Sequence, residues 1–221
     1  MKKILSLILA LVMCLSLCAC GSDKKAFEAS KEAHDNIDIA YEITERFASD
    51  IYEAWRLGIY EEDEILEDGA KHLAAELSLS EYEIKVGVAY SVAGILGTGW
   101  DTMTEDEKNN LINNTDSIFS VMEDDLFSFC VMAVTGAYTA NGKVEEAQNA
   151  LDSAKAQMKK LSEDYSDYEH YPNLKGYFTT TSSFFEFCQD PTGSFEQIKD
   201  TINKYKNEAR DYISDLDYIF E

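Results

Sequence analysis

Apolar residues recur every three or four positions through two long segments near the carboxyl end of the chain. In residues 144–168 the recurring positions are Val144, Ala147, Leu151, Ala154, Met158, Leu161, Tyr165 and Tyr168. In residues 195–219 they are Phe195, Ile198, Ile202, Tyr205, Ala209, Tyr212, Leu216 and Ile219. This spacing places each set on one face of an α-helix. We call each of these apolar lines a seam. Because both helices carry a seam with the same spacing, we expect them to pack against each other.

The helical period continues through the rest of the chain, and prolines occur only at 172 and 191. It predicts further helices over residues 24–58, 61–77, 80–96, 104–139 and 173–188. Capping boxes mark three helix starts, at Ser80–Glu83, Thr104–Glu107 and Ser194–Gln197. The pattern predicts an all-α fold, an antiparallel bundle of about six to seven helices. We expect one domain over residues 24–221, and a division into two sub-bundles near 97–104 is left open.

The chain is strongly acidic. It has 42 Asp and Glu residues against 19 Lys and Arg residues, which gives a formal net charge of −23. Nucleic-acid binding needs clustered basic side chains that neutralise phosphates, so this balance argues against a nucleic-acid partner. Anionic lipid headgroups would also repel the chain.

The first residues have the parts of a secretory signal. Two lysines are followed by the run Ile4–Leu17, which is apolar apart from Ser6 and Ser16, and by the small residue Ala19. That run is too short for a spanning helix, which needs roughly 20 apolar residues. Cys20 and Gly21 follow it, so Leu17-Cys18-Ala19-Cys20 resembles the lipobox of bacterial lipoproteins. Ordinary secretion without lipid is the alternative, but it requires a small residue where Leu17 stands.

The resemblance covers residues 1–22 only, and the rest of the chain resembles no characterised family. It implies that residues 1–19 are removed and that the thiol of Cys20 carries lipid. Residues 20–23 would then be a short tether for an acidic helical domain on the extracytoplasmic face of the cell membrane. Removing residues 1–19 takes away two lysines and no acidic residue, so the net charge becomes −25. Whether the host has one membrane or two stays open.

Outside the signal, the only cysteines are Cys130 and Cys188, each flanked by phenylalanines. They could form a disulfide in an oxidising compartment. We favour two buried free thiols that pack as small apolar groups. No Cys-x-x-Cys pair is present, so the sequence offers no structural zinc motif.

Residues for chemistry are scarce. Asp68, His72 and Glu76 follow one another at intervals of four, so on a helix they share a face and are candidates for one cation. A solvated polar face is the alternative, because zinc and iron sites normally use more nitrogen or sulfur ligands. The run Thr179–Ser183 has no partner base in a recognisable arrangement. The sequence therefore predicts no catalytic residues and no cofactor.

Aromatic residues gather around the turn at Pro172. The candidates for ligand binding there are Tyr165, Tyr168, His170, Tyr171 and Tyr177. Such a polar-aromatic cluster suits a sugar or a peptide, whereas packing of the turn is the alternative.

Two hypotheses of function follow. The first is a membrane-anchored, non-catalytic binding or interaction module, whose partners are the bilayer and an unidentified protein, glycan or small molecule. The second is a divalent-cation-dependent enzyme or metal receptor built on acidic helix faces.

Overall fold

A computed structural model describes the backbone of residues 2–220 and the side chains of residues 24–123 and 125–220. The side chain of Cys20 lies outside the described residues. Residues 2–220 form helices and short connections and contain no strand, which confirms the all-α prediction. They contain nine α-helices rather than six to seven. These are α1 (Lys2–Tyr60), α2 (Glu62–Glu76), α3 (Glu81–Ile95), α4 (Glu105–Asn113), α5 (Thr115–Val121), α6 (Leu126–Ala140), α7 (Lys143–Asp164), α8 (Tyr171–Gln189) and α9 (Phe195–Phe220).

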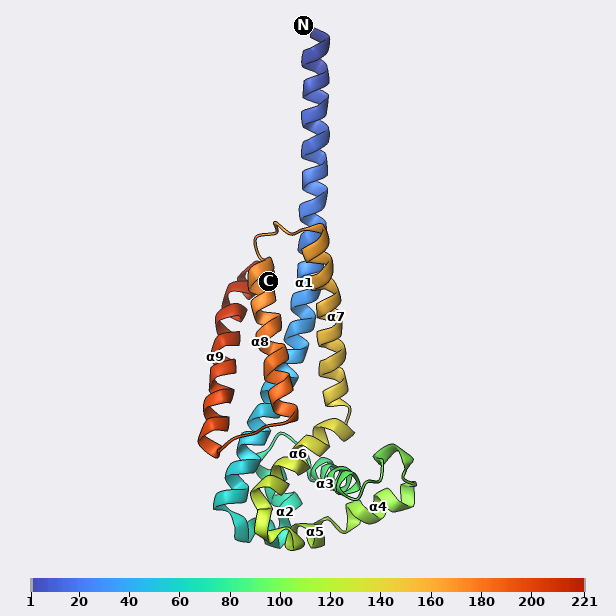
Figure 1. Cartoon of the computed structure of the whole chain (residues 1–221), viewed down its shortest axis with the longest axis vertical. Helices are drawn as coiled ribbons and strands as arrows, with labels where there is room; N and C mark the ends of the chain where they lie inside the picture. Colours follow the sequence, from blue (N-terminus) through green and yellow to red (C-terminus); the bar gives the residue numbers. More distant parts are fainter. Residues whose placement is uncertain (1, 221) are drawn as a thin grey trace.

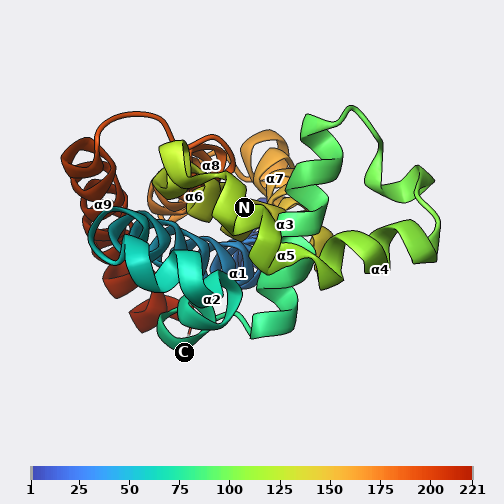
Figure 2. The ribbon, with the colours of Figure 1, turned by 90° about the horizontal axis from the view of Figure 1, so that it is seen from below.

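Helix α1 organises the molecule. It runs the full height of the structure, with α7, α8 and α9 beside its middle part and α2 to α6 gathered at its carboxyl end (Figure 1). Seen from that end, α2, α3, α5 and α6 cover the base and α4 lies at the outer edge (Figure 2). The buried face of α1 alternates small and large side chains, which lets neighbouring helices approach closely: Ala33, Ile37, Ala40, Phe47, Ala48, Ile51 and Ala54.

The seams of α7 and α9 are buried, but the predicted pairing between these helices is wrong. Helix α7 packs against α1 and α8, and α9 packs against α8 and α1. The connections from α7 to α8 and from α8 to α9 are short, so α8 becomes the neighbour of both. Both seams therefore face a shared core that includes Leu174 and Phe184 of α8.

The single helix predicted over residues 104–139 is also wrong, because the chain turns at Asn114 and between Met122 and Asp125. The breaks separate α4, α5 and α6, with a 3₁₀ turn, η2 (Glu123–Asp125), before α6. Phe119 and Phe129 are both buried, with ring centroids 5.2 Å apart. A continuous helix would separate them by about 15 Å along its axis. The breaks thus allow two phenylalanines to share one core.

The capping predictions are confirmed. The Ser80 and Thr104 side chains each accept a hydrogen bond from the backbone three residues on, and Glu83 and Glu107 return one. The hydrogen bonds from Thr104 lower the pKa of the Glu107 carboxyl. The Ser194 backbone likewise donates to Gln197, at 2.8 Å. These starts are local signals, which explains why the sequence alone locates them.

Helices α3 and α6 cross at unusually close range. A Cβ atom on Gly87 would overlap the carbonyl oxygen of Ala133, and one on Gly136 would overlap the carbonyl oxygen of Gly87. At the same crossing the Ser91 hydroxyl donates to the Met132 carbonyl at 2.7 Å. The two glycines permit this contact because neither has a side chain.

Cys130 and Cys188 are free and fully buried, as favoured from the sequence. Burial raises the pKa of the Cys130 thiol to about 12 and raises the pKa of Cys188 as well. We therefore predict that a chain of residues 21–221 shows no thiol reactive toward Ellman's reagent at mildly alkaline pH while folded. Because the thiolate is the reactive form, both thiols should react after denaturation. Reaction of either thiol in the folded protein would contradict this burial.

Among the helices whose side chains are described, none is long and apolar enough to cross a membrane.

Candidate functional site

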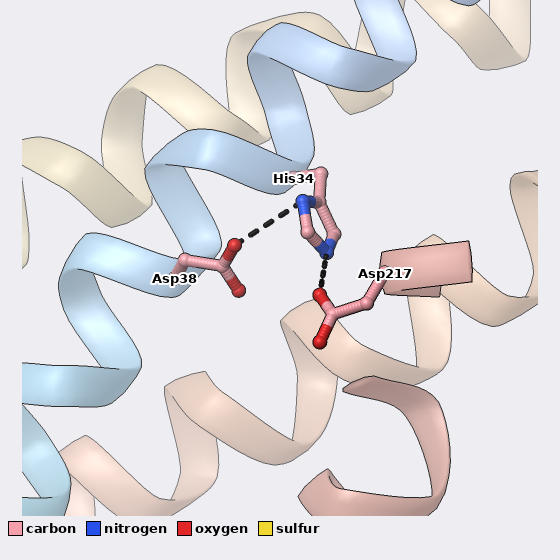
Figure 3. A group of neighbouring side chains, drawn as sticks. All are labelled: His34, Asp38 and Asp217. Atoms are coloured by element: carbon pink, nitrogen blue, oxygen red, sulfur yellow. Dashed lines mark ion pairs between the residues drawn. The ribbon is translucent and has the colours of Figure 1, made fainter. Parts of the chain in front are cut away.

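A buried histidine lies between two carboxylates where α1 meets α9 (Figure 3). His34 is only 4% exposed. Its Nδ1 atom is 3.2 Å from Oδ2 of Asp38, one turn further along α1. Its Nε2 atom is 3.6 Å from Oδ1 of Asp217 on α9. We call His34, Asp38 and Asp217 the His34 cluster.

Helix α8 contributes a fourth polar group. The hydroxyl of Tyr177, a fully buried residue, donates a hydrogen bond of 2.8 Å to Oδ1 of Asp38. Burial raises the pKa of Asp38, and the nearby His34 and the Tyr177 hydrogen bond partly oppose that rise. Burial and the charge of Asp38 raise the pKa of Tyr177. Tyr177 therefore stays a neutral donor that orients the Asp38 carboxylate.

Aromatic rings surround the imidazole. The ring centroid of Phe220 is 5.0 Å from that of His34, and the ring of Tyr177 is 6.1 Å away. Within the described side chains, Nε2 of His34 is buried without a hydrogen-bond partner, because 3.6 Å to Asp217 is too long for one. The cluster thus combines an Nδ1 atom 3.2 Å from a carboxylate oxygen with a buried Nε2 atom that has no hydrogen-bond partner.

Sequence reasoning missed this cluster. One signal was present, since His34 and Asp38 are four residues apart on the same face as Ile37 and Tyr41, which proved to be buried. Asp217 is far away in sequence, and only the packing of α9 on α1 brings it close.

In the predicted set Asp68, His72 and Glu76, the first two side chains pair with other residues. The backbone at Asp68 is not helical, with φ −153° and ψ 66°, so α2 is kinked there. Nε2 of His72 lies 2.7 Å from Glu61, and the Asp68 carboxylate is 3.5 Å from the Lys71 ammonium. In the part of the chain with described side chains, the one group of three or more residues close enough to hold a metal ion is the His34 cluster.

The predicted aromatic candidates are distributed over three places. Tyr177 is in the core, whereas Tyr165 and Tyr168 line a hollow beside the amino-terminal half of α1. The Tyr168 and His170 rings make an edge contact at 5.3 Å. Tyr171 instead lines a groove between α7 and α8. The structure therefore does not bring the five side chains into one site.

The groove between α7 and α8 has a mixed character. Its floor includes Met158 and Phe178, and three lysines stand around it: Lys155, Lys159 and Lys175. Asp152 lines the same groove, and Lys159 lies 3.8 Å from Glu163, so the rim carries three lysines and nearby acidic groups over an apolar floor. Such a surface suits the anionic or polar end of a partly apolar ligand.

Comparison with known proteins finds no matching family model, no matching curated protein and no matching solved structure.

Proposed function

We propose that this protein is a lipid-anchored bacterial lipoprotein that acts as a non-catalytic binding or interaction module on the extracytoplasmic face of the cell membrane. The observation that carries the proposal is the sequence Leu17-Cys18-Ala19-Cys20-Gly21 after a short apolar run. After cleavage before Cys20, the lipid on its thiol would hold the chain in the bilayer.

The course of α1 supports a bundle held close to that surface. Helix α1 is continuous from Lys2 to Tyr60, so no flexible linker separates Cys20 from the core. Ala26 and Ala29 already belong to the buried core. We propose that α1, α7, α8 and α9 form an antiparallel bundle standing on this short tether.

The acidic residues near the tether would be repelled by an anionic membrane. The connection between α7 and α8 lies beside the amino-terminal half of α1 (Figure 1) and carries Asp167 and Glu169, with Asp164 at the end of α7. Acidic groups close to anionic headgroups would be repelled. The lipid must therefore supply the attraction to the membrane, and the repulsion would keep the bundle upright.

The groove between α7 and α8 supports the binding role. It lies between the carboxyl-terminal half of α7 and the amino-terminal half of α8, and its lysines can attract an anionic group from solution. The partner that this proposal implies is a protein, glycan or small molecule outside the cytoplasm.

Replacing Cys20 tests whether this residue carries the lipid that anchors the protein to the membrane. We predict that the wild-type chain, expressed in a bacterial host, incorporates an alkyne-labelled fatty acid and sediments with membranes. Cys20→Ala should lose the label and leave the membrane-anchored pool, because the lipobox pattern places the lipid on this thiol alone. Cys18→Ala is the matched control and should keep both properties. A Cys20→Ala variant that still carries the label would refute the proposal.

A further inference from the structure

The unsatisfied nitrogen of His34 requires an explanation. Buried side-chain nitrogens almost always have a partner, and an unseen ion is one recognised reason for an exception. His34 is 96% buried, and its Nε2 atom points toward the Asp217 carboxylate without reaching hydrogen-bond distance (Figure 3). Nothing else in the described side chains satisfies this atom.

We propose that Nε2 of His34 and the carboxylate of Asp217 bind a divalent transition-metal cation of the zinc class. Zinc lies about 2.0–2.1 Å from imidazole nitrogen and about 2.0–2.2 Å from carboxylate oxygen. Two such ligands at a tetrahedral angle are separated by about 3.3–3.5 Å. The observed Nε2 to Oδ1 distance of 3.6 Å is close to this separation.

Asp38 and Tyr177 supply the support that a metal-binding histidine needs. Such a histidine usually donates its other ring N–H to a carboxylate, which fixes the tautomer and makes the bound nitrogen more basic. Here Oδ2 of Asp38 lies 3.2 Å from Nδ1, within ion-pair distance, and the Tyr177 hydroxyl donates a hydrogen bond to Oδ1 of Asp38. With the imidazole proton on Nδ1, the lone pair of Nε2 faces the Asp217 side.

The chemistry of the ligands selects the class of cation. Imidazole favours zinc, copper, iron and nickel, whereas calcium and magnesium prefer oxygen ligands. The Asp217 side chain is 44% exposed, so a cation can enter from solvent and complete its coordination with water. The ion would join α1 to the last turns of α9, where Lys31 already donates to the Phe220 carbonyl at 3.1 Å.

The competing account needs no metal. A protonated His34 could form ion pairs with Asp38 and Asp217 on its two sides. The two accounts differ in whether the folded protein takes up zinc at this place. The proposal does not depend on lipidation, because the cluster lies wholly within the described helices.

Calorimetric titration with Zn²⁺ tests the site. The full chain is purified in detergent without a histidine tag, and millimolar Mg²⁺ occupies the acidic surface. We expect one Zn²⁺ per chain. Asp217→Asn should weaken binding at least tenfold, and Asp38→Asn should weaken it by about 10–100-fold, as expected for loss of a supporting carboxylate.

Matched controls separate this site from surface binding. Asp211→Asn removes an exposed charge from the same helix, and His72→Gln removes the histidine paired with Glu61, so both should bind like the wild type. Circular dichroism checks that each variant is folded. The proposal is overturned if the wild type binds no Zn²⁺ under these conditions, or if folded Asp217→Asn binds it as tightly as the wild type.

Discussion

Gly87→Ala is expected to destabilise the protein by about 3 kcal/mol, the upper part of the range for overpacked cores. The added methyl group would overlap the Ala133 carbonyl oxygen and also crowd Ala137. These are backbone and short side-chain atoms that cannot rotate away, so α3 and α6 must separate. Separation of the two helices would also open the close contact between Gly136 of α6 and the Gly87 carbonyl oxygen of α3. Urea unfolding followed by circular dichroism measures the loss.

Gly94→Ala is the matched control on the same helix. A Cβ atom at Gly94 meets nothing within 4 Å. The substitution should therefore stabilise the protein by up to about 1 kcal/mol, through the better helix propensity of alanine. A loss of stability in Gly87→Ala and a gain in Gly94→Ala, one heptad away, would establish that α3 and α6 cross at close range. A Gly87→Ala variant as stable as the wild type would show that α3 and α6 do not cross at this distance.

Asp50→Ala is expected to produce a loss of about 3 kcal/mol, because buried groups that lose a charged partner are left unsatisfied. Asp50 is 5% exposed and accepts a hydrogen bond of 2.9 Å from the Ser78 backbone and one of 2.8 Å from the Tyr138 hydroxyl. It joins α1 to the connection before α3 and to α6. Its removal therefore loosens three elements together.

A graded series checks the Asp50 prediction. Tyr138→Phe removes one of these hydrogen bonds and keeps the ring stacked on Phe47 at 4.3 Å, so it should lose about 1–2 kcal/mol. Asp200→Ala, on an exposed position of α9, should change stability by less than about 0.5 kcal/mol. If Asp50→Ala behaves like Asp200→Ala, the buried network does not stabilise the fold.

The helices were predictable because their signals are local. The capping pairs at Ser80 and Thr104, and the seams of α7 and α9, depend on residues within a few turns of each other. The breaks in the predicted helix 104–139 were not predictable, because they are stabilised by the meeting of Phe119 and Phe129 in a core that also includes α2. Propensity alone does not report such tertiary packing.

Less of the His34 cluster could be predicted from the sequence. Tyr177 was grouped with its sequence neighbours around Pro172, although its spacing from Leu174, Thr181 and Phe184 matches the buried face of α8. Its hydroxyl contacts Asp38, and Asp217 meets His34, only because α8 and α9 fold back onto α1. Contacts between residues so distant in sequence depend on the packing of whole helices and carry no local pattern.

The mass of the amino-terminal peptide tests the lipoprotein proposal most directly. The protein is extracted from bacterial membranes, digested, and analysed by mass spectrometry for the peptide that begins at residue 20. We predict a peptide that starts at Cys20 and carries a diacylglyceryl group on its thiol, with no peptide from residues 1–19. An unmodified peptide that begins at Met1, or a lipid-free amino terminus downstream of Cys20, would contradict the proposal.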